Sequence, residues 1–468
     1  MNRDFLLASG GTGLVCWART PTRIMHYAAH PSQGLLPHQG FRHSLQRTLL
    51  LGLLAVGTAS AQTIGNHHAV YDARGVLQPW TSWRDALGRE VNWYLQCPVE
   101  HGYPRFVFTT FMDGRYQPIA QRPSFIPATQ DGLGILSYLK YHAFTGRKDD
   151  RVLQVARAMG DYLVKEAVTP DAGRYPRFTR STGARARFPQ PPDCGSQDDQ
   201  PYEVEPDKGG LAGYALVLLY EETRDEVYLR QALQNARVLA TNQVAGTATR
   251  SPWPFRVDYR TGAGRGDVSG NMSFNLRLYD KLIEHGYTEF RPPRAQLWAW
   301  IKDVQLPNLA HDGLLWVNFF EDHSEPTDRT AWAPLNLARY LIEQRDALDP
   351  DWQRDAQALI EFVNRNFVHL CNGIASCGEQ DFDQHPWGGI ATTYGAVLAL
   401  YARATGSLEY KGLAYQTLTW SLYGINDDGC PYDGVWKGAG RGGWQEDAHT
   451  DKLHNVLDAL AAFPEWGE

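Results

Sequence analysis

A helical hairpin that recurs six times is the sequence feature that most limits how this chain can fold. Six long apolar segments, rich in Gly and Ala, begin near residues 131, 208, 271, 330, 388 and 450. More polar segments with charges at helical spacing alternate with them and cover 80–95, 148–167, 224–242, 293–305, 350–367 and 407–423. A helix that is apolar around most of its circumference is buried on several sides, whereas an amphipathic helix lies at the surface.

Alternating outer and inner helices predict an all-α fold. A repeat of about 60 residues cannot bury its apolar faces alone, so the hairpins must stack or close. We expect them to close into an (α/α)6 toroid that spans 62–468 as a single catalytic domain, with the inner helices around a central funnel; an open helical solenoid is the alternative. The links from outer to inner segments are long, so long loops gather on the face where the inner helices begin, and such loops commonly carry function.

The N-terminal 61 residues have the pattern of an extension followed by a secretory signal peptide. Arg42 and Arg47 precede the apolar run LLLGLLAV, and the small residues ASA then form a cleavage site before Gln62. This run is too short to span a bilayer as a helix. The pattern predicts removal of 1–61, a periplasmic or secreted protein, and no membrane partner after cleavage.

Composition narrows the class of protein further. Hydrophobic residues make up 43% and charged residues 21% of the 468 residues, as in ordinary globular proteins, and the net charge of -7 argues against a nucleic-acid partner. No P-loop and no G-x-S-x-G motif is present, so we expect no cofactor. We also expect no metal, although the alternating acids Glu379, Asp381 and Asp383 leave calcium as an alternative.

An oxidising compartment permits disulfides. Cys371 and Cys377 enclose the short loop CNGIASC, and we expect them to form a bridge. The partners of Cys97, Cys194 and Cys430 cannot be assigned from their spacing.

Acidic clusters precede four of the inner segments, as in YEVEPDKGG, CGEQDFDQHPWGG and GGWQEDAHTD. Glycosidic cleavage needs two carboxyl groups on opposite sides of the scissile bond, one of them protonated, and burial among aromatic rings raises a carboxyl pKa. The candidate catalytic residues are Glu446, Asp447, Glu379, Asp381, Glu205, Asp207 and His449. The alternative role is helix capping, by Asp131, by Asp207 and by Asp451 or Thr450.

Arginines and aromatic residues fill the other loops, as in RYPRFTR and SPWPFR. Arg binds planar anions bidentately, so these loops suit a carboxylate or sulfate on a sugar, and aromatic faces stack on sugar rings. Simple solvated charge is the alternative. The candidate substrate-binding residues are Arg177, Arg180, Tyr175, Trp253, Arg256, Trp387 and Trp444.

The hairpin turns YHAFTGRKDD and YARATGSLEYKGLAY resemble those of the six-hairpin glycosidase superfamily, over about residues 80–463. The segment QDGLGILSYLKYHAFTGR is also similar to the corresponding turn of uronyl C5-epimerases. The resemblance implies the toroid fold and a carbohydrate-active enzyme, since the superfamily includes glycoside hydrolases, polysaccharide lyases, uronyl hydrolases and sugar epimerases. Its motif is structural, so it assigns no catalytic residue.

These observations together predict a secreted glycoside hydrolase that acts on a polysaccharide or oligosaccharide, acidic ones included. The alternative is a polysaccharide lyase that cleaves a uronate-containing polymer by β-elimination, with Tyr175, Arg177 and His449 as candidates for its base and its neutralising group. A third possibility is a toroid that binds glycans without catalysis.

Overall fold

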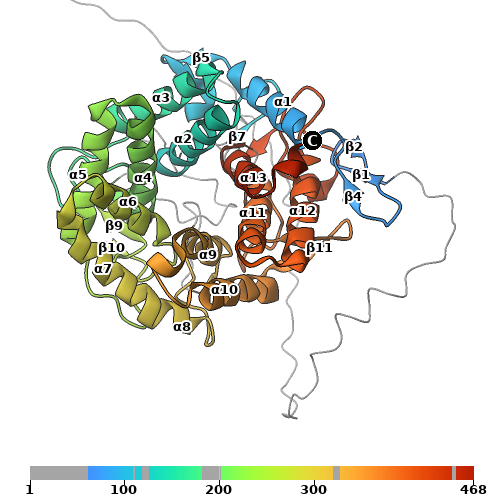
Figure 1. Cartoon of the computed structure of the whole chain (residues 1–468). Helices are drawn as coiled ribbons and strands as arrows, with labels where there is room; N and C mark the ends of the chain where they lie inside the picture. Colours follow the sequence, from blue (N-terminus) through green and yellow to red (C-terminus); the bar gives the residue numbers. More distant parts are fainter. Residues whose placement is uncertain are drawn as a thin grey trace, which may run out of the picture. The chain divides into compact units, whose positions relative to one another are not determined.

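Two concentric layers of helices form the body of the protein, as the view along the ring axis shows (Figure 1). The computed structural model describes residues 62–108, 111–118, 126–181, 200, 202–319, 327–444 and 449–468. All elements named below belong to one unit, Ser60–Glu468. The segment assigned to the signal peptide, 1–61, lies outside the described residues.

The inner layer consists of α2 (Pro127–Phe144), α4 (Pro206–Thr223), α6 (Ser273–Glu284), α9 (Trp332–Gln344), α11 (Gly388–Thr405) and α13 (Asp451–Ala462). The outer layer consists of α1 (Trp83–Leu95), α3 (Asp150–Lys165), α5 (Glu226–Asn242), α7 (Arg291–Trp300), α10 (Trp352–Asn366) and α12 (Leu408–Leu422). A π-helical turn, Ile301–Gln305, continues α7 into α8 (Leu306–Asn308).

Within the described ranges, every expected inner helix is present and begins within four residues of its predicted position. Each inner helix contacts the next, in the order α2, α4, α6, α9, α11, α13, and α13 then contacts α2. The ring is therefore closed. The prediction of an (α/α)6 toroid is confirmed, and the open solenoid is wrong.

The strands are short, antiparallel, and lie in the connecting segments. β8 (Glu203–Val204), β9 (Arg256–Asp258) and β10 (Gly264–Arg265) form a three-stranded sheet in the order β10-β9-β8. β7 (Phe111–Met112) pairs with β13 (Gly443–Trp444), which joins the loop before α2 to the loop before α13. The remaining pairs are β1 (Thr63–Ile64) with β2 (His67–His68), β3 (Val70–Tyr71) with β4 (Leu77–Gln78), β5 (Val99–Glu100) with β6 (Tyr103–Pro104), and β11 (Val368–Cys371) with β12 (Ile374–Cys377).

The helix ends differ between the two layers. Four outer helices begin at a residue whose side chain accepts a backbone N–H, namely Ser82, Asp149, Asp225 and Ser407. In the described part of the chain, none of the inner helices has such a cap. Capping is therefore not the role of Asp131, Asp207, Asp451 or Thr450.

The predicted disulfide is wrong. The β11–β12 hairpin pairs Cys371 with Ile374 and Cys377 with Val368, so the two cysteines lie at opposite ends of the ladder. Three residues along a strand span about 10 Å, whereas a disulfide needs Cα atoms within about 7 Å. Both thiols are free, as are those of Cys97 and Cys430, while Cys194 lies outside the described residues.

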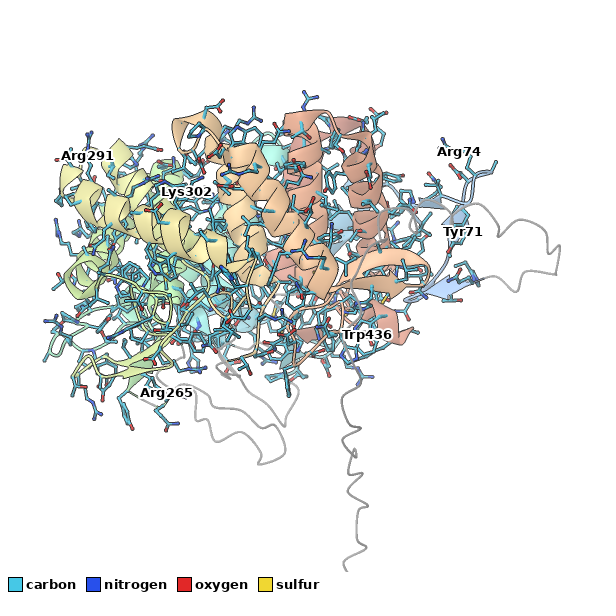
Figure 2. The ribbon with its side chains drawn as sticks, turned by 90° about the horizontal axis from the view of Figure 1, so that it is seen from below. Tyr71, Arg74, Arg265, Arg291, Lys302 and Trp436 are labelled. Atoms are coloured by element: carbon cyan, nitrogen blue, oxygen red, sulfur yellow. The ribbon has the colours of Figure 1, made fainter. Side chains whose placement is uncertain are left out.

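The side view places Arg265 and Trp436, from two loops that precede inner helices, on the same face of the ring (Figure 2). We call this the loop face. Among the helices of the described chain, we find none with the length and apolar character that crossing a membrane requires.

Candidate active site

The loop before α13 joins the last hairpin to the first, and a buried polar network lies at this seam. Glu90 of α1 lies 3.1 Å from His449 (Oε1 to Nδ1), and the hydroxyl of Tyr138 lies 2.9 Å from Nε2 of the same ring. Lys452 Nζ is 3.3 Å from the other oxygen of Glu90. All four side chains are buried.

Burial lowers the pKa of His449 and so favours the neutral ring, although the hydrogen bond to Glu90 opposes this shift. A carboxylate can only accept, so Nδ1 carries the proton and donates to Glu90, while Nε2 accepts from the Tyr138 hydroxyl. The ring of Tyr94 stacks on the imidazole at 3.7 Å between centroids and holds its orientation. Glu90, His449 and Tyr138 therefore form a continuous hydrogen-bonded chain, which we call the relay.

A second carboxyl group at the seam, Asp433, was not among the candidates that the sequence suggested. It is 2% exposed, and the backbone N–H of Trp444 donates to its Oδ2 at 3.2 Å. Burial raises the pKa of Asp433 to about 7, against the opposing effects of that N–H and of the Lys452 and Lys437 charges. The segment PYDGVW places this acid between aromatic residues in the last long loop, and that pattern could have pointed to Asp433.

A cluster of aromatic rings lies near the start of α11. The rings of His385 and Trp436 stack at 3.9 Å between centroids, and Trp387 meets Trp436 edge-on at 5.6 Å. Lys437 Nζ lies 4.1 Å from the centre of the Trp387 ring. We call His385, Trp387 and Trp436 the aromatic platform. Because His385 is half-exposed, the platform is accessible from the loop face.

A separate cluster of paired charges is buried at the start of α4. The β8–β9 register brings Glu205 opposite Arg256, whose Nε lies 3.1 Å from Oε1 of the glutamate. Lys208 Nζ lies 3.2 Å from Asp207 and 3.7 Å from the centre of the Phe319 ring. Burial raises the pKa of Asp207, and the Lys208 charge opposes this shift. The structure thus brings together Glu205, Asp207 and Arg256 in a buried network of opposite charges.

Two of the acids before α11 accept hydrogen bonds from neighbouring side chains. Arg329 holds both oxygens of Asp381, at 2.8 and 3.0 Å. Asp383 accepts from the His385 ring at 2.5 Å and from Trp387 Nε1 at 3.0 Å. Glu379 is buried, and its backbone oxygen accepts from Ala331. Among the described residues, no group of three or more His, Cys, Asp or Glu side chains is placed to hold a metal ion.

Several candidate substrate-binding side chains belong to the core. Trp253 is fully buried and donates to the Leu239 carbonyl at 3.1 Å, and Tyr175 packs edge-on against Phe178. Arg180 is buried, with its guanidinium 5.6 Å from the Tyr259 ring centre.

Two further candidates lie nearer the surface. Arg177 is half-exposed and lies 3.7 Å from Asp171. Trp444 is half-buried in β13. Tyr175 and Arg177 make none of the contacts of His449, so the lyase trio is not brought together. Glu446 and Asp447 lie outside the described residues.

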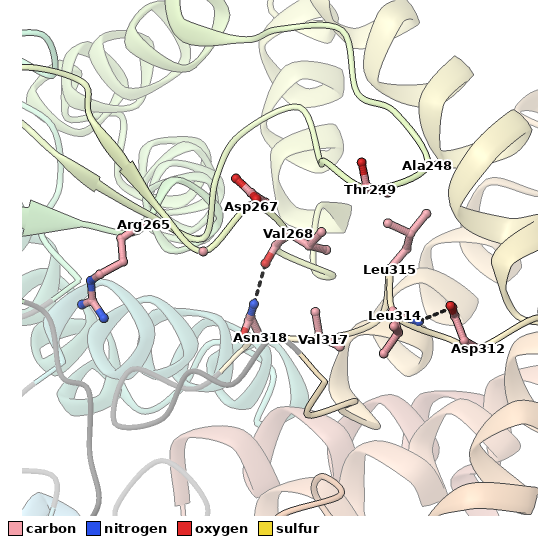
Figure 3. A pocket seen from close by; sticks show the side chains of 11 residues that line it. Ala248, Thr249, Arg265, Asp267, Val268, Asp312, Leu314, Leu315, Val317 and Asn318 are labelled. Atoms are coloured by element: carbon pink, nitrogen blue, oxygen red, sulfur yellow. Dashed lines mark hydrogen bonds between the residues drawn. The ribbon is translucent and has the colours of Figure 1, made fainter.

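A hollow of about 510 Å³ also opens between residues 248–249, 265–268 and 312–318 (Figure 3). Its apolar lining includes Leu314, Leu315 and Val317. Asn318 donates to the Val268 carbonyl at 2.7 Å across the hollow. Together with the aromatic platform, it gives the loop face two separate surfaces where a ligand can lie.

No family model matches the sequence, and no curated protein matches it. Solved structures do match across the ring. A cellobiose 2-epimerase from Spirochaeta thermophila is 12% identical with a TM-score of 0.60, and the match covers 82% of this chain and 96% of that one. A D-mannose isomerase is 10% identical with a TM-score of 0.58, over 81% of this chain and 97% of that one.

A family 76 glycoside hydrolase from a bovine Bacteroides thetaiotaomicron strain is 12% identical with a TM-score of 0.53, over 82% of this chain and 78% of that one. At such identities the similarity establishes architecture. The fold, an (α/α)6 toroid, is one that this chain shares with these solved structures.

Proposed function

We propose that this protein is a carbohydrate-active enzyme that hydrolyses a glycosidic bond of a polysaccharide or oligosaccharide bound on its loop face. The observation that carries the proposal is Asp433, a buried carboxyl at the seam with a pKa of about 7. A carboxyl with that pKa is still partly protonated at neutral pH, as a general acid must be. The matched structures include a glycoside hydrolase and two enzymes named for sugars, which is consistent with this class of substrate.

In the proposed reaction, Asp433 donates its proton to the glycosidic oxygen as the bond to the sugar carbon breaks. The carboxylate that remains is stabilised by the Lys452 and Lys437 charges and by the Trp444 N–H. The aromatic platform stacks on the faces of neighbouring sugar rings. It supplies binding, whereas the carboxyl supplies the chemistry.

The sugar carbon must at the same time gain a new C–O bond, and this step needs a second carboxylate. In inverting enzymes that carboxylate lies about 6.5–9.5 Å from the acid and takes a proton from the water that attacks the carbon. In retaining enzymes it lies about 5 Å away and attacks the carbon itself, and water then hydrolyses the glycosyl-enzyme ester. We propose Glu446 or Asp447 for this role, since they follow Trp444, which contacts Asp433, by only two and three positions. Glu379 is the next candidate.

Export is part of the same proposal. An enzyme that cleaves a polymeric substrate outside the cytoplasm has to be exported. This agrees with a signal peptide at 1–61 and a periplasmic or secreted catalytic domain at 62–468. Sequencing of the mature N-terminus from the producing cell tests this directly. A mature chain that begins near Gln62 supports it, and an uncleaved chain contradicts it.

The test of the function is Asp433→Asn, assayed for reducing ends released from a panel of neutral and uronate-containing polysaccharides. We expect turnover to fall roughly a hundredfold or more. The wild-type decline in kcat/KM above a pH of about 7 should disappear from the residual activity of the variant.

The matched control is Asp428→Asn, in the same loop, where the half-exposed carboxylate pairs with Arg441. It should keep wild-type turnover. Unchanged turnover in a folded Asp433→Asn protein would reject Asp433 as the acid.

A second candidate function rests on the Glu90–His449–Tyr138 relay. In a lyase, the Tyr138 oxygen would take the proton α to a uronate carboxyl while its own proton passes to His449. The β C–O bond would break as the C=C bond forms, and Tyr138 would give its new proton to the leaving oxygen as His449 returns the first one. Burial raises the pKa of Tyr138 well above its ordinary value, so its hydroxyl keeps its proton and is a poor base, which makes hydrolysis the better-supported reading. An ultraviolet-absorbing unsaturated product that disappears in Tyr138→Phe and persists in Asp433→Asn would reverse this preference.

A further inference from the structure

A cavity of about 380 Å³ lies inside the ring of inner helices, away from the loop face. Its lining residues belong to α2, α4, α6, α9 and α13, together with Arg147 just after α2. Lys140, Glu222 and Glu343 lie toward the C-terminal ends of their helices, which places the opening on the face opposite the loops. We call it the distal cavity. Its volume is near the lower end of small-molecule pockets.

An amide without a partner faces the distal cavity. Asn336 of α9 is 6% exposed and lines the cavity, and no hydrogen bond joins its side chain to any residue that the structure describes. The rest of the side chain is enclosed while the amide stays open to the cavity, so the amide can hydrogen-bond only to what the cavity holds, water or a ligand. One turn along the same helix, Arg339 hydrogen-bonds to His454 at 3.2 Å. The wall is therefore polar and held in place, with the Asn336 amide left to bind a ligand.

The charges around the distal cavity are matched. Arg147 contacts Glu222 at 3.1 and 3.2 Å, Arg277 pairs with Glu343, and Lys140 pairs with Asp458. Arg339 shares Asp458 with Lys140, so each of these cations already lies beside a carboxylate, which lowers the attraction of the cavity for an anion. The pairs instead present N–H donors beside carboxylate acceptors. The Asn336 amide likewise offers both a donor and an acceptor. Hydroxyl groups also donate and accept, so they satisfy such a surface.

The remaining wall is apolar. Tyr214 and Phe274 lie 6.2 Å apart between ring centroids, and Leu136, Leu139 and Leu218 complete this side. A sugar combines C–H faces with a rim of hydroxyls and matches both parts of the wall. We infer that the distal cavity is a second saccharide site, for one or two sugar rings, which the Asn336 amide recognises. The inference is independent of the proposed hydrolysis at the seam.

The test is saturation-transfer NMR and calorimetry on the full chain, with D-glucose and maltose as probes. The variants are Asn336→Leu, which keeps the size of the side chain without its amide, and Leu139→Trp, which fills the cavity. Trp387→Ala on the aromatic platform is the control for binding on the loop face. We expect a binding component that weakens at least tenfold in both cavity variants and is retained in Trp387→Ala.

Three results would overturn the inference: no binding of either sugar by the wild type, unchanged binding in the two cavity variants, or Asn336-dependent binding of acetate or phosphate in place of sugar. If the thermal midpoint shows that Asn336→Leu does not fold, Leu139→Trp decides, because the half-buried Leu139 leaves room for the larger ring to adjust.

Discussion

At the scale of single residues, burial makes the ionisation of Asp433 a matter of stability as well as of chemistry. Its pKa is about 7 in the folded protein against 3.8 ordinarily. Between these values the folded state binds a proton that the unfolded state has lost, so the free energy of unfolding falls as the pH rises, by about 1.4 kcal/mol per pH unit at most. Above the folded pKa, both states are ionised and this effect stops growing.

Asp433→Asn removes that dependence. Relative to wild type, the variant should gain unfolding free energy as the pH rises from about 4 to about 7 and then level off. Urea unfolding at a series of pH values measures the difference. Parallel curves for variant and wild type would show that Asp433 ionises normally, and would also weaken its assignment as the general acid.

At the scale of elements, the inner helices approach closely because glycine replaces a side chain where they touch. A Cβ on Gly210 of α4 would overlap the side chain of Asn275 of α6, and one on Gly213 would lie 2.7 Å from Leu278. Gly412 of the outer helix α12 has nothing within 4 Å of that position. The same substitution should therefore have opposite effects in the two layers.

We expect Gly210→Ala to destabilise the protein by about 1–3 kcal/mol through overpacking. Gly412→Ala should be neutral or should stabilise by up to about 1 kcal/mol, since alanine favours the helix. Denaturant midpoints of the two variants make the comparison. Equal midpoints would mean that α4 and α6 separate without cost.

At the scale of the whole molecule, ring closure depends on ties between segments far apart in the chain. Asp458 of α13 lies 2.5 Å from Lys140 of α2 and 3.3 Å from Arg339 of α9, so one carboxylate links three inner helices. Burial favours the protonated form of this acid, but the two cations hold the pKa of Asp458 below its ordinary value. Its stabilising effect is present above the ordinary carboxyl pKa and is lost as the pH falls through the folded one.

Asp458→Asn should lower the free energy of unfolding at neutral pH by about 3 kcal/mol, because it leaves the buried Arg339 and the half-buried Lys140 without their carboxylate. Glu465→Gln, which removes a surface pair with Lys411, should change it by less than about 1 kcal/mol. Calorimetry of both variants checks the contrast. If the thermal midpoints of the two variants shift by the same amount, the stability of the ring does not depend on the ion pairs of Asp458.

Much of the fold could be predicted from the sequence because helical burial repeats locally. The period of the apolar residues in each segment indicates which faces of its helix are buried, even when the neighbouring segment is unknown. The sequence therefore predicted which helices are inner, which are outer, and their order. Chain closure followed from the number of hairpins. The spacing of Cys371 and Cys377 gave a wrong prediction of a disulfide. Whether two cysteines meet in a hairpin depends on its register, which is set by pairing across the turn.

The candidate site was only partly readable, because its members are distant in sequence. The sequence by itself determined that acids, arginines and aromatic rings gather in the loops before the inner helices. Only the tertiary structure decided that Glu90 and Tyr138, 359 and 311 residues from His449, would meet its ring. It also decided that Trp253 would enter the core, and that Asp433 would be buried. The reason is physical: residue type and local period are properties of a segment, whereas burial, hydrogen-bond partners and pKa belong to the closed ring.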